Sequence, residues 1–381
     1  MSQQEFLGID SATLEKQGAY WTAREIAQQP TIWSQLLDQY QSQQSCLQQW
    51  LQPIMGTPAL RIIMTGAGTS AYIGEALRPH LTDVLGLAPG QVIEAISTTD
   101  ILSNPGQYLR ADVPTLMISY GRSGNSPESR AAVALADQVI GQCWHLVISC
   151  NPEGALARAC QSNPCYQLFL MPEQAHDKSF AMTSSFTSMM LATLLIFAAD
   201  SDQFSAMIEQ SKSLLADSLS EIKALAQQDC KRLVFLGSGP LLGIAREAAL
   251  KCLELTAGRL VSCYESPLGF RHGPKSMVDE QTQILLLKSG HSYTGAYDQD
   301  LLDELRSDDK AMYISSPFSQ KQLEQGGLAD IWLAFPYILY CQCLAFYKAL
   351  YLGISADNPC PSGEVNRVVQ GVTLYPYEGG R

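Results

Sequence analysis

The sequence predicts an α/β protein built from two related, doubly wound domains, each a parallel sheet flanked by helices, behind a helical arm. The main observation is an internal repeat: an apolar strand-like run, a Gly-x-Gly turn and an amphipathic helix occur at 60–81 and again at 231–255. A second segment, 116–129, has its counterpart at 284–297, where R-S-G-N-S becomes K-S-G-H-S. Strand-like and helix-like runs alternate through both halves, and this alternation favours parallel sheets with helices on both faces.

The chain divides into three parts. Residues 1–50 are rich in Gln, carry helix-like spacing with a break at Pro30, and form the expected N-terminal helical arm. Residues 51–205 form the expected first domain, and residues 206–381 the second, with a catalytic segment and the C-terminal tail. The polar stretch 200–228 has helix-like composition and joins the two domains.

Composition indicates which partners the protein does not bind and in which compartment we expect it. The net charge of −12 argues against nucleic acid, because phosphate backbones need clustered Lys and Arg. The eleven cysteines are scattered and contain no C-x-x-C pair, which is typical of reduced thiols in a cytoplasmic protein. The N-terminus has no signal-peptide pattern, and the apolar run 186–200 is short for a membrane span. We therefore expect a cytoplasmic protein that binds neither nucleic acid nor membrane.

The two copies of the repeat differ in their hydroxyl groups. Thr69 and Ser70 follow the first glycine turn, whereas Pro240 and Leu241 follow the second. Further hydroxyls of the first copy are Ser119, Ser123, Ser126, Ser179, Thr183, Ser184 and Ser185. The first copy is thus the one expected to hold a polar ligand.

The loop after the strand-like run 116–120 is a candidate phosphate site. Exposed N–H groups at a helix start, together with Ser hydroxyls, bind phosphate without a metal, and Arg122 adds a fixed charge. Pro127 and Glu128 suit the first turn of the following helix. A purely structural alternative is that Ser126 only caps this helix and that the glycines only make the turn.

A nicotinamide site is the competing interpretation of "GAGTSAYIG". The G-x-G-x-x-G spacing fails, because Ala71 stands where the third glycine belongs. Glu94 lies in the zone of the expected acidic residue, but three hydroxyl-bearing loops suit a phosphorylated sugar better than a pyrophosphate. No cofactor is therefore expected.

With "ISYGRSGNSPE" added to "GAGTSAYIG", the chain resembles the SIS (sugar isomerase) fold of phosphosugar isomerases and binders. "TAREIAQQPTIW" resembles the helical lead-in of tandem-SIS enzymes such as the isomerase half of glucosamine-6-phosphate synthase. Over nearly the whole chain, the resemblance is closest to the bacterial galactosamine-6-phosphate deaminase/isomerases, also described as tagatose-6-phosphate ketose/aldose isomerases. It implies two tandem SIS domains and a homodimer whose active site lies at the subunit boundary.

The resemblance also implies the ligand contacts. Ser123 and Ser126 would hold the phosphate, with Arg122 beside them, while a third hydroxyl loop would contact the sugar. The binding residues so assigned are Gly68, Thr69, Ser70, Arg122, Ser123, Ser126, Thr183 and Ser184.

Catalytic roles follow from two further matches. "AALKCLEL" resembles the synthase's isomerase segment, which implies that Glu254 carries the proton between C1 and C2, with Lys251 as its neighbour. "FRHGP" looks like the family's H-G-P turn and implies that His272 opens the sugar ring, in its own subunit or across the dimer. The remaining histidines, at positions 80, 145, 176 and 291, are expected to be structural.

These roles imply a reaction in amino-sugar catabolism. Galactosamine 6-phosphate would open, lose a proton at C2 and regain one at C1, and the resulting imine would react with water to give tagatose 6-phosphate and ammonia. We therefore expect a deaminase, isomerase and hydrolase that needs neither metal nor cofactor. The tail has Arg367 and no lysine, and since arginine forms no imine, the synthase's covalent route is not expected.

Other functions stay open at this point. A plain tagatose-6-phosphate ketose/aldose isomerase would use the same two catalytic residues, and so would a glucosamine-6-phosphate deaminase, because the sequence does not reveal the C4 configuration. A non-catalytic phosphosugar sensor would keep the hydroxyl loops without needing Glu254 and His272. The oligomeric state beyond a dimer is also open.

Overall fold

The structure is a computed structural model that describes residues 4–161, 163–369 and 371–379. Its contacts divide the chain into two compact units, each assembled from separate segments. We call them the five-stranded and the four-stranded unit. The five-stranded unit comprises Thr31–Asp177, Ser184–Ala199 and Gly363–Arg381, and the four-stranded unit comprises Met1–Pro30, Lys178–Thr183 and Asp200–Ser362. The division into repeat domains at 50 and 205 stays a prediction.

The five-stranded unit contains a sheet in the order β4-β3-β5-β6-β7, in which every neighbouring pair is parallel. Its strands are β3 (Arg61–Thr65), β4 (Val92–Ala95), β5 (Thr115–Gly121), β6 (Cys143–Ser149) and β7 (Tyr166–Leu170). The central strands β3 and β5 are buried along their whole length, which explains their continuous apolar runs. All loops that leave the carboxyl ends of these strands meet at one edge of the sheet.

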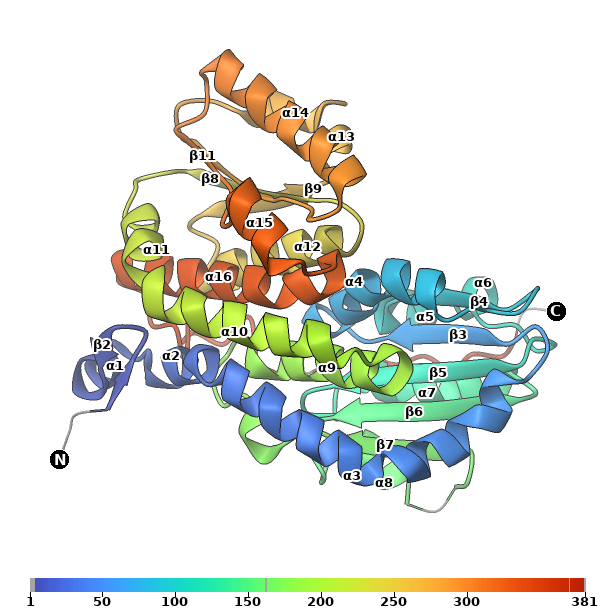
Figure 1. Cartoon of the computed structure of the whole chain (residues 1–381). Helices are drawn as coiled ribbons and strands as arrows, with labels where there is room; N and C mark the ends of the chain where they lie inside the picture. Colours follow the sequence, from blue (N-terminus) through green and yellow to red (C-terminus); the bar gives the residue numbers. More distant parts are fainter. Residues whose placement is uncertain (1–3, 162, 370, 380–381) are drawn as a thin grey trace. The chain divides into compact units, whose positions relative to one another are not determined.

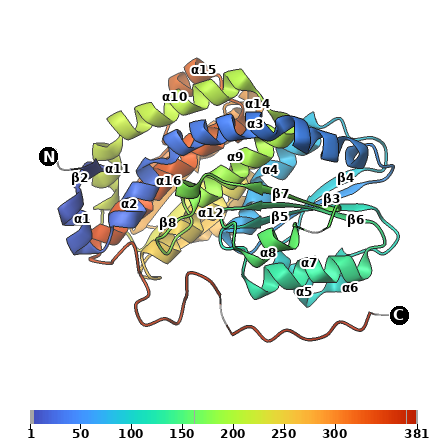
Figure 2. The ribbon, with the colours of Figure 1, turned by 90° about the horizontal axis from the view of Figure 1, so that it is seen from below.

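Helices cover both faces of this sheet (Figures 1 and 2). Its helices are α3 (Gln29–Met55), α4 (Thr69–Val84), α5 (Thr98–Ser103), α6 (Pro105–Tyr108), α7 (Pro127–Val139), α8 (Ala155–Ala159), η1 (Glu173–Ala175) and α9 (Ser184–Ala198). Ile63 and Met117 pack with α5 and α7 on one face. The next residue along β3, Met64, points to the other face, where Gly74 of α4 approaches it.

The four-stranded unit repeats the same topology in its own sheet, of order β11-β10-β8-β9, again with parallel neighbours. Its strands are β8 (Arg232–Gly237), β9 (Val261–Glu265), β10 (Thr282–Leu287) and β11 (Tyr313–Ser315), and a short antiparallel pair, β1 (Glu5–Phe6) and β2 (Ile9–Asp10), lies near the N-terminus. Counted from the first strand, the two sheets run 2-1-3-4-5 and 2-1-3-4, so the parallel α/β fold and the repeat are confirmed.

Helices also flank both faces of the four-stranded sheet (Figure 1). The helices of this unit are α1 (Ser11–Gln17), α2 (Tyr20–Ala27), α10 (Ser201–Asp217), α11 (Leu219–Ala226), α12 (Pro240–Leu255), α13 (Pro267–Phe270), η2 (Pro274–Met277), α14 (Ser292–Asp308), α15 (Gln320–Gly326) and α16 (Asp330–Tyr351). Helices α12 and α16 pack together on one face, while α13 and α14 cover the other.

Helix α16 is the apolar core helix of the four-stranded unit. It is long and apolar enough to cross a membrane by composition, but 94% of its most apolar window is buried inside the protein. Cys341 and Cys343 lie in this helix as buried thiols, and the chain's other cysteines are free as well. The helix thus has the properties of a packed core element.

Candidate active site

The first glycine turn joins β3 to α4 at the carboxyl edge of the five-stranded sheet. A Cβ atom on Gly66 would lie 2.5 Å from the Cβ atom of Ser70, so a larger residue does not fit at this position. Gly68 has a φ of 55° and directly precedes the helix. Thr69 and Ser70 lie nearly buried in the first turn of α4, where helix N–H groups favour an anion.

The R-S-G-N-S loop leaves the neighbouring strand β5 at the same edge. Gly124 has a φ of 63°, and Asn151 Nδ2 donates to the backbone oxygen of Ser123 at 2.9 Å, which braces the turn from the β6 side. The hydroxyl of Ser123 accepts from the N–H of Asn125 at 3.3 Å. Within the described chain, the N–H groups of Ser123 and Gly124 have no hydrogen-bond acceptor. Two backbone donors of this loop can therefore bind an external oxyanion.

Ser126 is the N-cap of α7. Its Oγ accepts from the N–H of Ser129 at 3.2 Å and donates to the hydroxyl of Ser129 at 2.7 Å, with Pro127 at the first helical position. Ser126 therefore caps α7, as the structural alternative predicted. A role in phosphate binding stays a prediction.

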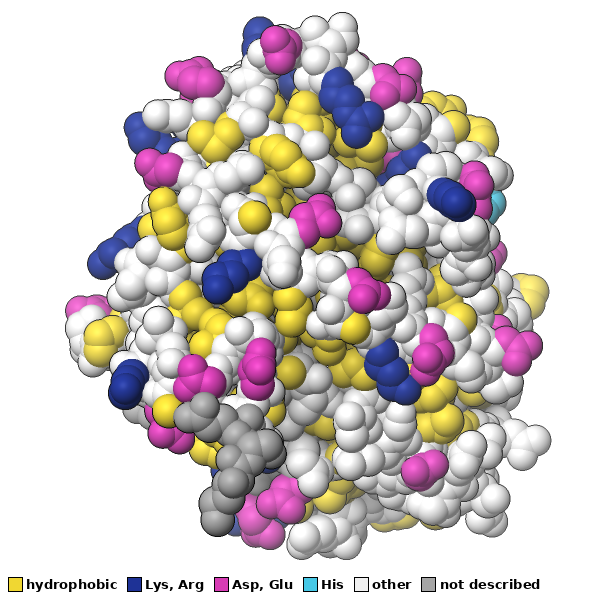
Figure 3. Space-filling view, turned by 60° about the vertical axis from the view of Figure 1, so that its left-hand side comes forward, with side chains coloured by type: hydrophobic (Ala, Val, Ile, Leu, Met, Phe, Trp, Pro, Cys, Tyr) yellow, Lys and Arg dark blue, Asp and Glu magenta, His cyan; other side chains and the backbone are white. Residues whose placement is uncertain are grey.

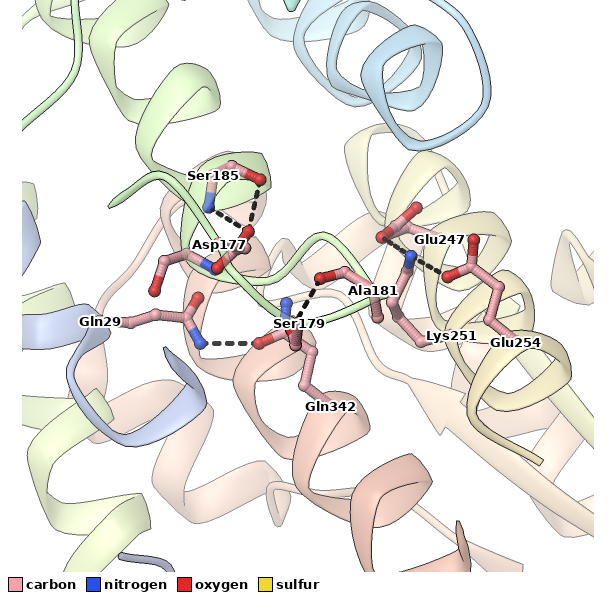
Figure 4. A network of polar contacts seen from close by, with 10 residues as sticks. Gln29, Asp177, Ser179, Ala181, Ser185, Glu247, Lys251, Glu254 and Gln342 are labelled. Atoms are coloured by element: carbon pink, nitrogen blue, oxygen red, sulfur yellow. Dashed lines mark hydrogen bonds and ion pairs between the residues drawn. The ribbon is translucent and has the colours of Figure 1, made fainter. Parts of the chain in front are cut away.

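The third hydroxyl loop starts α9 and is organised by a residue that the sequence analysis did not single out. The buried carboxylate of Asp177 accepts from the N–H of Ser184 at 3.0 Å and from the N–H of Ser185 at 2.9 Å (Figure 4). Ser184 and Thr183 are both buried, but Thr183 belongs to the four-stranded unit. Asp177 thus caps α9 and fixes the loop.

Two arginine side chains, Arg122 and Arg367, lie near the hydroxyl loops of the five-stranded unit. The guanidinium of Arg122 donates to the backbone oxygen of Arg367 at 2.6 Å, and Arg367 in turn donates to the backbone oxygen of Asp177. Burial lowers the pKa of His176, and the positive charges of Arg367 and Arg122 lower it further. His176 had been expected to be structural. Its position just before a hydroxyl loop, after a strand-like run, was the sequence signal that could have suggested a site.

The four-stranded unit carries the predicted catalytic pair on α12. The ammonium of Lys251 is fully buried, contacts the carboxylate of Glu254 and lies 3.4 Å from the carboxylate of Glu247 (Figure 4). Burial alone would lower the pKa of Lys251, but the two carboxylates outweigh burial and raise it. Glu247, which the sequence analysis missed, is fully buried, whereas the side chain of Glu254 keeps 24% exposure. Of the two carboxylates, only that of Glu254 is accessible to a substrate.

His272 lies on an exposed turn between α13 and η2, as the H-G-P pattern predicted. The backbone N–H of His272 donates to the backbone oxygen of Gly269 at 2.9 Å, and Gly273 has a φ of 128°. The residues on either side are tied to α14, because Arg271 pairs with Asp300 and Glu304, and Lys275 pairs with Glu304 and Asp308. The imidazole is therefore presented outward on a braced turn.

The structure does not bring Glu254 and His272 together within the four-stranded unit. Glu254 belongs to α12 on one face of the sheet, and the turn of His272 packs with α14 on the opposite face (Figure 1). In contrast, the predicted pair Lys251 and Glu254 is in direct contact. Within the five-stranded unit, the loops of Ser70 and Ser123 leave adjacent strands at one edge of the sheet.

Ligands for a metal gather elsewhere in the five-stranded unit. Among the described residues, Asp137, Cys143 and His145 offer three ligand atoms within 4.8 Å of one another. They lie at the amino end of β6, away from the loops at the carboxyl edge, and His145 Nε2 already pairs with Asp137 Oδ1 at 2.9 Å. The candidate residues of the two loops are hydroxyls, glycines and an arginine, which suit an oxyanion better than a metal ion.

Charges on the surface are intermixed on the face drawn in Figure 3. Lys and Arg side chains stand apart from one another there, among Asp and Glu side chains. Across the described residues of this face, the basic side chains form no continuous stripe of the kind that follows a nucleic-acid backbone.

Comparison with known proteins places the chain in a family. A model of the SIS domain matches residues 57–199. D-galactosamine-6-phosphate deaminase AgaS from Shewanella sp. (strain ANA-3) is 53% identical over 97% of this chain and 95% of its own length, and its namesake from Escherichia coli is 43% identical over 94% and 96%. The crystal structure of tagatose-6-phosphate ketose/aldose isomerase from Escherichia coli is 40% identical, with a TM-score of 0.86 over 97% of this chain and 98% of that one.

These relatives correct one expectation. They are named as deaminases and isomerases, so the expected assignment as a hydrolase is wrong. With a relative at 53% identity along nearly its whole length, the chain belongs to the SIS-domain family of enzymes that contains the D-galactosamine-6-phosphate deaminases AgaS.

Proposed function

We propose that this chain converts galactosamine 6-phosphate to tagatose 6-phosphate and ammonia in amino-sugar catabolism. The observation that carries the proposal is the carboxylate of Glu254, partly exposed and held by the buried ammonium of Lys251, in a chain 53% identical to a named D-galactosamine-6-phosphate deaminase. A positioned carboxylate is what proton transfer between C2 and C1 of an open-chain sugar requires.

Phosphate binding is assigned to the loops of the five-stranded unit. The N–H groups of Ser123 and Gly124 have no acceptor in the described chain, and Ser70 and Thr69 lie in the first turn of α4 on the adjacent strand. A phosphate bound there would receive backbone hydrogen bonds and the dipoles of two helices, with Arg122 as counter-charge. In this proposal Gly68, Ser126, Thr183 and Ser184 shape the loops around the substrate.

The chemistry proceeds by two proton transfers and one exchange with water. After ring opening, Glu254 takes the proton from C2, which the C1 aldehyde acidifies, and returns a proton to C1. The electron pair of the C2–H bond passes through an enolamine and leaves a C2 imine. Water adds to this imine and ammonia departs, which gives the ketose. Lys251 carries a raised pKa and stays protonated, so it keeps the Glu254 carboxylate in place.

Ring opening is assigned to His272 of a second copy of the chain. Within one copy, the His272 turn and Glu254 lie on opposite faces of the four-stranded sheet, whereas the imidazole is exposed and available to a neighbour. The proposal therefore includes a homodimer with the active site near the subunit boundary. It also includes a cytoplasmic location and a reaction without metal or cofactor.

A plain tagatose-6-phosphate ketose/aldose isomerase is the second candidate, because a solved relative at 40% identity carries that name. Glucosamine 6-phosphate is the alternative substrate. The same residues would act in each case, since deamination is an aldose–ketose isomerisation with nitrogen at C2.

The test is ammonia release by the purified protein from galactosamine 6-phosphate and glucosamine 6-phosphate, side by side. Release from the galacto sugar alone is the expected result. Release from neither, with interconversion of tagatose 6-phosphate and its aldose, would establish the isomerase instead. Binding without turnover of any of these sugars would favour a phosphosugar sensor.

A further inference from the structure

The second copy of the R-S-G-N-S loop, Lys288–Ser292, binds two carboxylates of its own chain. The N–H of Ser289 donates to Asp298 Oδ2 at 2.8 Å, and the N–H of Gly290 donates to Asp330 Oδ1 at 2.9 Å. The hydroxyl of Ser289 donates to Asp330 Oδ2 at 2.6 Å. All three donors therefore point at negative charge.

The two loops correspond residue by residue. Each follows the third strand of its sheet in chain order, β5 or β10, and each leads into a helix, α7 or α14, on the same face. Aligned on R-S-G-N-S and K-S-G-H-S, four of the five buried positions of each helix coincide. The coinciding pairs are Ser129 with Gly295, Ala132 with Asp298, Leu135 with Leu301, and Ala136 with Leu302.

This alignment matches the backbone donors as well. Ser123 corresponds to Ser289 and Gly124 to Gly290, yet the N–H groups of the first pair have no acceptor in the described chain. For Ser289 the difference follows from one side chain: the fully buried Asp298 reaches the second loop with a carboxylate, whereas the fully buried Ala132 has only a methyl group. For Gly290 it follows from Asp330. Asp330 is the first residue of α16, while α9, the corresponding helix, begins with Ser184.

The second loop holds the carboxylate of Asp298 although burial opposes its charge. Burial raises the pKa of Asp298, and nearby Asp330 acts in the same direction; the Ser289 N–H, the Ser238 hydroxyl and the Lys288 ammonium act against it. An uncompensated buried carboxylate is unfavourable, because it loses its hydration. Charge-assisted hydrogen bonds from the loop must offset this penalty, so the loop has the properties of an oxyanion site.

We propose that Lys288–Ser292 is a second phosphate-binding loop that Asp298 and Asp330 keep closed, and that it takes a phosphate monoester once both carboxylates are removed. The ligand class rests on the proposed function of the first loop. The closed loop limits each chain to one phosphosugar. It also explains how the duplicated fold can use its second half for the α12 residues without a competing substrate site.

The test is the number of galactosamine 6-phosphate molecules bound per chain, measured by equilibrium dialysis with Glu254→Gln present in every protein so that the sugar is not turned over. The chain with the wild-type loop should bind one, and Asp298→Ala/Asp330→Ser, which copies the first loop, should bind two. Glu209→Ala/Asp217→Ala on α10 removes the same charge away from the loop and should still bind one. One molecule per chain in the folded loop variant overturns the proposal.

A reverse exchange tests the same idea in the first loop. Ala132→Asp should place a carboxylate where Asp298 stands in the second loop and raise KM at least tenfold, whereas Ala132→Asn, of equal size and no charge, should raise it less than threefold. Equal effects of the two variants would contradict the role of charge. If Ala132→Asp does not fold, the number of molecules bound by Asp298→Ala/Asp330→Ser decides the proposal by itself.

Failure of the proposed function remains distinguishable. If wild type binds neither amino-sugar phosphate, the proposed substrate is wrong, and inorganic phosphate becomes the probe. A gain of one phosphate per chain in Asp298→Ala/Asp330→Ser over wild type then still supports the closed loop, and no gain overturns it.

Discussion

Exchange of Glu254 for Gln tests the proposed chemistry most directly. The substitution keeps the shape of the side chain and removes its ability to accept a proton. Lys251 remains 3.4 Å from the carboxylate of Glu247, so the buried ammonium keeps one anionic partner. The amide oxygen of the new Gln can still accept from Lys251. Because the side chain is partly exposed, we expect a loss of unfolding free energy of only about 1 kcal/mol.

The effect on turnover should be far larger. A positioned general base typically contributes about 10²- to 10⁴-fold in rate, which corresponds to about 2.7–5.4 kcal/mol of transition-state stabilisation. The affinity for galactosamine 6-phosphate should change less than threefold, since the phosphate contacts are assigned to other residues. The fall should therefore be in kcat.

The assay combines three measurements on one preparation of Glu254→Gln. They are ammonia release, exchange of the C2 proton of the substrate in deuterated water, and direct binding of the phosphosugar. Glu221→Gln on α11, in the same unit, serves as the control and should keep full activity. If Glu254→Gln retains more than a tenth of wild-type kcat and still exchanges the C2 proton, the assigned role is refuted. Parallel loss of binding and turnover would instead indicate a structural residue.

Three further predictions concern buried charges. Lys251→Met leaves the buried Glu247 without its cation and should lower the unfolding free energy by about 3–5 kcal/mol in urea melts. Because the folded pKa of Lys251 lies above 10.5, its contribution is present below that pH and lost as pH rises through the raised value, so the variant's deficit should shrink in strongly alkaline buffer. Asp177→Asn weakens the cap of α9 and should remove about 0.5–2 kcal/mol, whereas an unchanged melting curve would contradict the capping role. The lowered pKa of His176 means that this imidazole binds a proton more tightly in the unfolded chain, so stability falls as pH drops below 6.5. His176→Gln should therefore raise the melting temperature at pH 5.5 relative to wild type and leave it unchanged at pH 8. A parallel shift at both pH values would exclude this origin.

Much of the fold was predictable because its signals are local. The runs 61–65 and 115–121 read as buried strands and are buried along their whole length. The glycine turns read as strand-to-helix loops, and Gly68 and Gly239 adopt nearly identical backbone angles at the start of α4 and α12. Pro30, expected as a break, lies in the first turn of α3, where proline is tolerated.

Part of the site was visible for the same reason. Lys251 and Glu254 are three positions apart on a helix, and this spacing brings two side chains together in any α-helix. Glu247, one turn earlier, follows the same rule. It was missed because its complete burial depends on how α12 packs against the sheet and α16.

The sequence by itself determined the repeat, the alternation of strands and helices, the glycine-containing loops between them and the carboxylate–lysine pair, because periodicity and spacing encode local geometry. Only the tertiary structure decided which distant groups meet. Arg122 contacts Arg367 across 245 positions of the chain, and Ser289 meets Asp330 across 41. It also put Glu254 and the His272 turn on opposite faces of one sheet. Such contacts depend on the packing of whole elements, which no local pattern specifies.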